Sequence, residues 1–167
     1  MNTIIKSSIT KLTAPIPVIV NSLYKNDTLI RETRIYDNPN NMYIVHRYYF
    51  NDKVYEKRET FKNNRIKLRI KCIDNKFNGK IATYQSGILD TYTSYKNDKA
   101  EGPCLINYNK DGVTIKLKGN FRDGIKSGIF SSANEKEYCV YFYNDQEVTK
   151  EDYINKGLAL SIAISLL

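Results

Sequence analysis

The sequence predicts an all-β fold, an elongated antiparallel meander of consecutive β-hairpins with a short C-terminal helix or apolar tail. An aromatic or aliphatic residue followed by a short turn rich in Asn, Asp, Lys or Gly recurs roughly every 11 to 13 residues, and a fixed period of this kind indicates one repeated supersecondary unit. Apolar and polar residues alternate between these turns, as they do in half-buried strands. The turns are also too short for parallel crossovers, so neighbouring strands must run antiparallel. The repeated segments begin at Tyr24, Tyr36, Phe50, Phe61, Ile73, Tyr84, Tyr95, Tyr108, Phe121 and Tyr143.

The chain of 167 residues has the length of one ordinary domain. We expect an N-terminal extension over residues 1–20, a hairpin repeat domain over residues 21–148 and a helix or apolar tail over residues 149–167. The apolar run near residues 16–20 is too short for the core of a signal peptide.

Two stretches show the alternation most clearly. Over residues 65–72, Ile, Leu and Cys occupy the even positions and Arg and Lys the odd ones, which predicts one buried and one cationic face. Residues 114–121 repeat the pattern, with Leu117 and Gly119 on the apolar side. Around Val140 and Phe142 the residues are apolar on both sides, which predicts a strand covered on both faces.

The expected turns have a conformational reason. Asp111-Gly112, Asp123-Gly124 and Asn78-Gly79 accept positive φ and favour tight hairpins. Asn63-Asn64 and Asn97-Asp98 are expected to be weaker versions, because Asn tolerates the left-handed region less well than Gly. The aromatic residue before each turn then recurs at equivalent places on successive strands, where neighbouring rings pack.

The C-terminus departs from this pattern. Thr149 and Asp152 have the spacing of a helix N-terminus, and residues 157–167 form an apolar segment much shorter than the roughly 20 residues of a membrane span. Three roles remain open: a helix docked on the sheet, a segment that pairs with another subunit, and a shallow membrane anchor. The candidate residues for self-association are Leu158, Leu160, Ile162, Ile164 and Leu166.

Residues 75–148 resemble the MORN repeat family, including the variant repeats of bacteria and large DNA viruses. The best match runs from Phe121 to Phe130 and has the family's aromatic-x-x-Gly-x-x-x-Gly core, while residues 95–102 keep the aromatic residue and the second glycine. Residues 24–73 share the period but none of the glycines. The resemblance implies a single-layer hairpin sheet that serves as a scaffold or protein-binding module, and some members are connected with phospholipid headgroups. It also implies turn-forming roles for Gly87, Gly102, Gly112, Gly124 and Gly128.

The sequence offers little for catalysis. His46 is the one histidine, and the three cysteines, Cys72, Cys104 and Cys139, have neither CxxC nor metal-ligand spacing. No Gly-rich phosphate loop or pair of catalytic carboxylates is evident. We therefore expect a non-enzymatic protein without catalytic, cofactor or metal site, and reduced thiols in a cytoplasmic location.

A basic stretch is the strongest candidate binding feature in a chain of net charge +8. If Arg65, Lys67, Arg69 and the exposed face of the preceding strand align, they form a cationic stripe able to follow a phosphate backbone or an anionic headgroup layer. The alternative is a solvated outer face whose lysines keep the sheet soluble. The candidate residues are Arg58, Lys62, Arg65, Lys67, Arg69 and Lys71.

These observations predict a scaffold or interaction module that holds a protein partner, including a second copy of the chain, on its sheet. The alternative function is the binding of a polyanion, either a membrane phosphoinositide or nucleic acid, through residues 53–71.

Overall fold

The structure is a computed structural model that describes residues 3–13, 16–38, 41–134 and 138–165, and only the backbone of residues 158–165. The chain forms two compact units, Met1–Asp98 and Lys99–Leu167, which we describe separately. Both are antiparallel β-meanders, so the predicted fold class is confirmed. The unit boundary falls inside the region expected to be one repeat domain.

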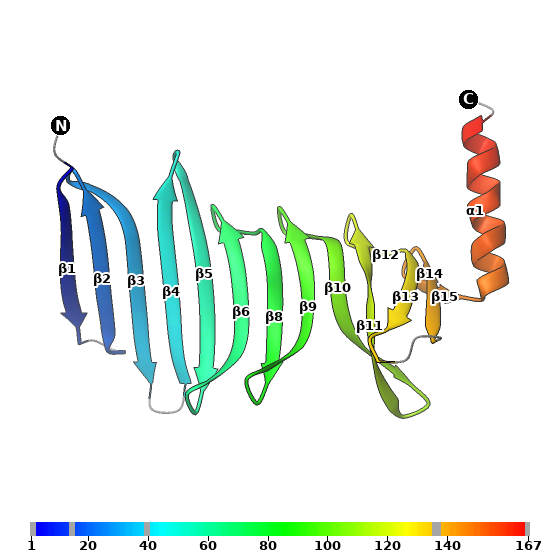
Figure 1. Ribbon diagram of the computed structural model, residues 1–167, viewed down its shortest axis with the longest axis horizontal. Coiled ribbons are helices and arrows are strands. Elements are labelled where there is room, and N and C mark those ends of the chain that lie inside the picture. The colour runs from blue at the N-terminus through cyan, green and yellow to red at the C-terminus, as the bar shows by residue number, and fades with distance from the viewer. Residues whose placement is uncertain (1–2, 14–15, 39–40, 135–137, 166–167) are drawn as a thin grey trace. The chain divides into compact units, whose positions relative to one another are not determined.

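Unit 1 is one antiparallel sheet whose strands follow one another in chain order (Figure 1). The short strand β7 pairs with β6 beside the main path. Because β1 and the start of β2 occupy much of residues 1–20, the expected N-terminal extension is part of the sheet. The strands are β1 (Ile5–Leu12), β2 (Val18–Lys25), β3 (Thr28–Asn38), β4 (Asn41–Phe50), β5 (Lys53–Lys62), β6 (Arg65–Ile73), β7 (Lys76–Phe77), β8 (Gly79–Gln85) and β9 (Ile88–Lys96).

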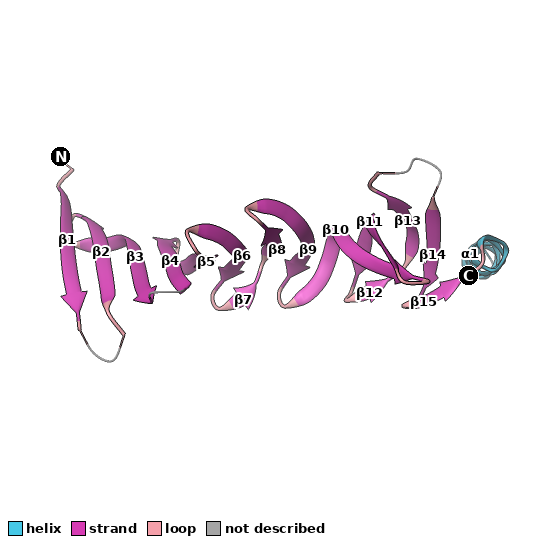
Figure 2. Cartoon of the chain, turned by 90° about the horizontal axis from the view of Figure 1, so that it is seen from below, coloured by secondary structure: helices cyan, strands magenta, loops and turns pink. Residues whose placement is uncertain are grey.

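Unit 2 is also an antiparallel meander, and it ends in the predicted helix. Its strand order is β10-β11-β13-β14-β15, and β12 pairs with β11 as β7 does with β6 (Figure 2). The Thr149 hydroxyl accepts a hydrogen bond of 3.1 Å from the Asp152 N–H, as the helix-start pattern predicted. The elements are β10 (Lys99–Lys110), β11 (Val113–Arg122), β12 (Ile125–Lys126), β13 (Gly128–Ser132), β14 (Cys139–Tyr143), β15 (Gln146–Val148) and α1 (Lys150–Ser165).

Most hairpin turns have two central residues with positive φ, the type I′ geometry that matches strand twist. Asn63-Asn64 and Asn97-Asp98 adopt it as fully as Asp111-Gly112 does. Asn78-Gly79 does not form the hairpin turn expected of it, although Gly79 has the expected positive φ, at +100°, and starts β8 after a break in the strand. The turn lies at Asp74-Asn75, where the repeat series also placed one.

The five glycines singled out by the repeat pattern divide into two groups. Gly87, Gly112 and Gly124 lie in turns. Gly102 lies inside β10 and Gly128 at the start of β13, so these two are strand positions rather than turn positions. All five have positive φ, and Gly79, Gly102 and Gly128 each lie four residues after the second turn residue.

Turn residues also clamp one hairpin to the preceding one. The Asp74 N–H donates to the Val54 carbonyl at 2.9 Å, and its carboxylate accepts from the Val54 N–H at 2.8 Å. Asp98 makes the same two bonds to Phe77, and Asp145 makes them to Lys126. We call this arrangement the turn clamp. It gives Asp and Asn at these turns a bonding role beyond their tolerance of positive φ.

Unit 2 has an apolar core on one face of its sheet. Leu117 and Phe130 are fully buried, and the Phe130 and Phe142 rings are 5.1 Å apart. Gly119 makes room for Phe130, because a Cβ atom at residue 119 would lie 2.3 Å from that ring. The alternation predicted over residues 114–121 thus builds this core.

Unit 1 is covered differently. Its buried apolar residues are Val45, Cys72 and Ala82, and none of the described residues of this unit forms a helix. Its other buried residues are three glutamates, Glu32, Glu56 and Glu59. Charged side chains therefore cover much of this sheet, in the place where other sheet proteins have a second layer of helices or strands.

Candidate functional site

Strand pairing places alternating charges side by side across β3, β4 and β5. Glu32 lies opposite Arg47, and Arg47 lies opposite Glu56. Arg34 and Arg58 lie two residues along their strands on the same side, because side chains alternate between the two faces. We call this side the Arg47 face, and the opposite side the His46 face.

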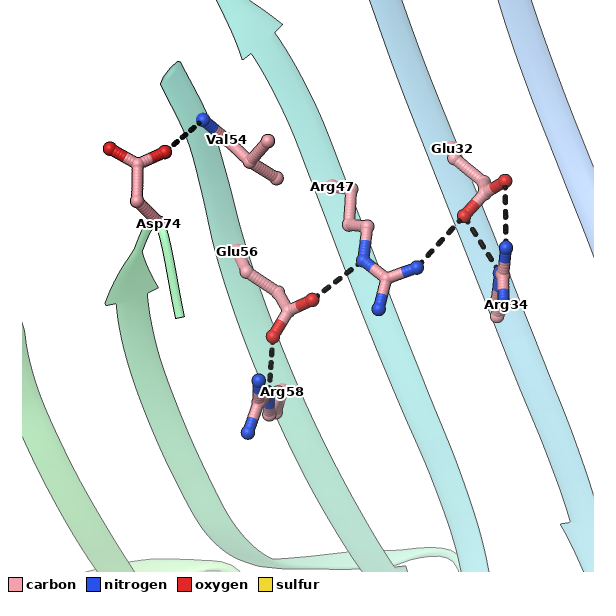
Figure 3. Close-up of polar contacts among 7 residues, drawn as sticks. All are labelled: Glu32, Arg34, Arg47, Val54, Glu56, Arg58 and Asp74. Carbon is pink, nitrogen blue, oxygen red and sulfur yellow. Dashed lines mark hydrogen bonds and ion pairs between the residues drawn. The ribbon is translucent and has the colours of Figure 1, made fainter. Parts of the chain in front are cut away.

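The charges on the Arg47 face form a continuous ladder (Figure 3). Arg47 donates from Nε to Glu56 at 2.6 Å and from Nη1 to Glu32 at 3.2 Å. Arg34 Nε donates to Glu32 at 2.7 Å, and Arg58 donates to the other Glu56 oxygen. Every oxygen of these two buried carboxylates thus accepts a hydrogen bond from an arginine.

Electrostatics within the ladder fix its ionisation. Burial acts to raise the pKa of Glu56, but the hydrogen bonds from Arg47 and Arg58 outweigh it and hold that pKa below its usual value. The hydrogen bond to Glu56 in turn raises the pKa of Arg47. Glu56 is therefore a fixed anion between two cations and not a proton donor.

The His46 face carries a second network centred on Glu59. Arg69 and Lys57 donate to this carboxylate at 2.8 and 2.9 Å. Burial, and after it the charge of Lys57, lower the pKa of His46, while Glu59 at 3.6 Å opposes the change. Thr33 lies 3.1 Å from His46 Nδ1. His46 is thus a half-buried member of a packed polar cluster, and its pKa is shifted away from the charged form.

The predicted basic stretch is divided among several places. Arg58 lies on the Arg47 face and pairs with Glu56, while Arg69 lies on the His46 face and pairs with Glu59. The six candidate cations therefore do not share one face, because Arg58 lies on the Arg47 face. Arg65, Lys67 and Arg69 are alternate residues of β6 and lie on one side of it, as the alternation predicted. The alternation predicted for β6 is confirmed, with Cys72 buried and Lys71 exposed.

Three of the predicted cations surround one hollow near the turns that follow β5 and β8. Its volume is about 430 Å³, and Asn63 and Ser86 complete its lining. Among the residues described by the structure, Lys62, Arg65 and Lys67 have no ion pair. We call it the Lys62 hollow.

A second hollow, of about 370 Å³, lies in unit 1 and has a mainly apolar lining. Tyr48, Tyr55 and Ile73 are opposite one another on β4, β5 and β6, on the His46 face. Lys57 and Lys71 form the next row and also line the hollow. Tyr48 is 45% exposed and Tyr55 37% exposed, so the aromatic surface is open to a ligand. We call it the Tyr55 hollow.

The C-terminal segment is described only in part. Leu158, Leu160, Ile162 and Ile164 belong to α1, but their side chains lie outside the description, and Leu166 lies outside the described residues. Within the described chain, no helix is long and apolar enough to cross a membrane.

The described residues contain no cluster of His, Cys, Asp and Glu able to hold a metal ion. Cys72 and Cys104 are buried free thiols, and burial raises the pKa of both. Cys139 is exposed.

Sequence reasoning missed the roles of Glu32, Arg34, Arg47, Glu56 and Glu59. The available signal was opposite charge at alternate positions of predicted strands, in Glu32-x-Arg34 and Glu56-x-Arg58. Comparison with protein-family models, with curated proteins and with solved structures gave no match.

Proposed function

We propose that this chain is a non-enzymatic interaction module that holds a protein partner on the His46 face of unit 1. The observation that carries this proposal is the Tyr55 hollow, where two half-exposed tyrosines and Ile73 form an apolar floor beside Lys57 and Lys71. Exposed aromatic residues in a shallow pocket are typical of binding hot spots.

The chemistry of the hollow defines the partner. An aromatic or aliphatic side chain fits the apolar floor, and a neighbouring carboxylate complements Lys71, for which no ion pair is found among the described residues. Lys57 is held by Glu59 at 2.9 Å and gives the hollow a fixed cationic wall. The ligand is thus a protein segment with an apolar anchor and an adjacent acidic residue.

Phage-displayed random peptides test this proposal. We expect the full chain to enrich peptides with an aromatic or aliphatic residue next to Asp or Glu. Tyr55→Ser should abolish that enrichment, because it removes the floor of the hollow. Ile88→Ser, which changes an apolar residue 74% exposed outside the hollow, is the matched control and should leave binding intact. Absence of enrichment, or equal loss with both variants, would overturn the proposal.

The Lys62 hollow favours a second candidate function, the binding of phosphate-rich polymers or headgroups. Lys62, Arg65 and Lys67 gather there with the Asn63 amide and the Ser86 hydroxyl, which can donate hydrogen bonds to phosphate oxygens.

Salt-dependent binding to a single-stranded oligonucleotide and to phosphoinositide-containing vesicles tests this second function and separates its two sources of phosphate. Reversing Lys62, Arg65 and Lys67 to Glu should weaken binding and reduce its salt dependence. Reversing the exposed lysines Lys25, Lys53 and Lys96 makes the same change in net charge elsewhere in unit 1 and is the control. Equal losses for the two triple variants would indicate only diffuse charge attraction.

A further inference from the structure

Strand β1 is an edge strand with an unusually open surface. Among the described residues it pairs with β2 alone, and every residue from Ile5 to Leu12 is exposed. Ile5 is 65% exposed and Ile9 is 72% exposed. A long exposed edge with apolar side chains is a template for pairing with another strand.

The hydrogen-bond pattern shows which backbone groups of β1 remain available. The Asn26 N–H donates to the Ile4 carbonyl at 3.0 Å, and the Ile4 N–H donates to the Asn26 side chain at 3.1 Å. Because residues of an antiparallel strand bond alternately to either side, Lys6, Ser8 and Thr10 bond to β2. The N–H and C=O groups of the odd residues therefore point away from the sheet. These residues are Ile5, Ser7, Ile9 and Lys11.

We propose that β1 pairs antiparallel with β1 of a second copy, about a two-fold axis at Ser8. This register places Ile5 opposite Lys11 of the second copy and Ser7 opposite Ile9 of the second copy. All the outward-pointing backbone groups of β1 then find partners at once. An axis at Ser7 would set Lys11 against Thr3 and an axis at Ile9 would set Ile5 against Thr13, and both threonines lie outside β1.

The side chains support the same register. Ile9 lies diagonal to Ile5 and Ile9 of the second copy, at a separation of about 7 Å at which long side chains still touch, so the exposed isoleucines cover one another. Lys6 lies opposite Thr10 of the second copy and not opposite a lysine, so no like charges face each other in this register. The Lys6 ammonium is also held by Asp27 of its own chain at 2.8 Å. The occupant that fits this edge is therefore a second copy of the same strand.

Sedimentation of the full chain over a range of concentrations tests the pairing, with an expected twofold rise in mass. Ser7→Pro removes an outward-pointing N–H that β2 does not use, so the variant should fold but sediment as a monomer. Ser7→Thr keeps the N–H and should sediment like the parent chain. A parent chain that stays monomeric, or a folded Ser7→Pro chain that still doubles its mass, would overturn the proposal.

Disulfide trapping tests the register and does not depend on how well the proline variant folds. In a Cys139→Ser background, which removes the exposed native thiol, Ser8→Cys places two thiols across the axis at a separation that disulfides tolerate. Thr10→Cys, on the same strand and face, is the control, because its counterpart in the second copy lies several residues away. Rapid cross-linking of Ser8→Cys alone is expected. Cross-linking of both variants at equal rates, or of neither, would contradict the register.

This pairing goes beyond the proposed function, since β1 does not line the Tyr55 hollow. Tyr55→Ser should leave the dimer intact, and Ser7→Pro should leave peptide enrichment at the Tyr55 hollow intact. The failure of one proposal is thus distinguishable from the failure of the other.

Discussion

The two units use the same hairpin design but cover their sheets by opposite means. Unit 2 buries Leu117, Phe130 and Phe142 in a continuous apolar cluster. Unit 1 buries Glu32 and Glu56 beneath arginines, together with Glu59 on the other face. A hairpin meander therefore does not require one kind of interior, and cross-strand pairs of opposite charge can replace apolar packing.

This difference bears on function as well as stability. Unit 2, which has a formed apolar core, already removes much of its own apolar surface from water. Unit 1 keeps Tyr48 and Tyr55 half exposed on a sheet with ordered charges around them, so its apolar surface remains available to a partner. The charge ladder and the Glu59 network hold that surface in place, because Arg47 and Arg69 are each fixed to a buried carboxylate.

The largest expected effect tests the apolar core of unit 2. Phe130→Ala should lower the free energy of unfolding by about 3–5 kcal/mol, because it removes a fully buried ring and leaves a cavity. Urea unfolding monitored by circular dichroism measures this loss. Phe50→Ala makes the same change at a ring that is 65% exposed, and it should stay within about 0.5 kcal/mol of the parent chain. Similar losses for the two variants would contradict the conclusion that unit 2, unlike unit 1, is stabilised by an apolar core.

The next effect tests the charge ladder of unit 1. Glu56→Gln keeps the shape of the side chain but removes the anion between Arg47 and Arg58. We expect a loss of about 2 kcal/mol, below the 3–5 kcal/mol of a fully buried pair, because the arginine heads keep some contact with water. Urea unfolding of this variant, compared with that of the parent chain, measures the loss.

Glu147→Gln is the control for this substitution, since the Glu147 side chain is 44% exposed in its pair with Lys110 and Gln keeps an oxygen that can accept the hydrogen bond from Tyr108. It should cost less than 1 kcal/mol. A neutral result for Glu56→Gln would mean that the ladder contributes nothing to the stability of unit 1.

Much of the fold was predictable from the sequence, because the turn residues and the alternation between them are local signals. The strand of residues 65–73 and the helix start at Thr149 follow directly from residue order. Gly79 was misread because Asn-Gly is a common hairpin dipeptide, whereas the chain already turns at Asp74-Asn75. A local signal cannot choose between two nearby candidate turns, because the register with the neighbouring strand decides which of them forms.

The candidate sites were less predictable, because they depend on which strands lie side by side and in what register. The sequence showed the cations of residues 58–71 but not that Arg58 and Arg69 lie on opposite faces. The Glu32–Arg47 and Arg47–Glu56 pairs join residues on different strands, and only the registers of β3, β4 and β5 bring them together. The Tyr55 hollow likewise depends on three strands.

The pH dependence of stability separates the two units further. Because the pKa values of Glu56 and Glu59 are lowered on folding, the unfolded chain binds protons more tightly at these residues. Their contribution to stability is complete above the ordinary pKa of 4.5 and is lost as pH falls through the folded-state values. The lowered pKa of His46 adds a loss that begins below 6.5. We expect the urea midpoint to fall with acid, and to fall less steeply in the Glu56→Gln/Glu59→Gln variant.

In unit 2 we expect the corresponding loss of stability at alkaline pH. Tyr108 donates a hydrogen bond of 2.6 Å to Glu147, which raises the pKa of Tyr108 to about 12. This contribution is present below the ordinary pKa of 10 and is lost as pH rises toward 12. Tyr108→Phe should reduce the loss of stability between these values and leave the loss in acid unchanged. An equal change in the acid loss and the alkaline loss would mean that the two titrations do not report on separate units.

The smallest effect tests a feature that the units share, the turn clamp. Asp74→Ala removes the carboxylate that accepts from the Val54 N–H and places Ala at a residue with φ of 50°. We expect a loss of about 1 kcal/mol, since the bond is exposed and charge-assisted. Asp74→Asn keeps an acceptor and tolerates positive φ, so it should recover most of that stability.

In unit 2, Asp145→Ala removes the same clamp from Lys126 and should cost a similar amount. Hydrogen exchange at Val54 and Lys126 checks the mechanism, because both amides should lose protection in the alanine variants. Unchanged exchange at these amides would show that the Asp residues act only through the turn conformation, and the clamp would then have no part in joining successive hairpins.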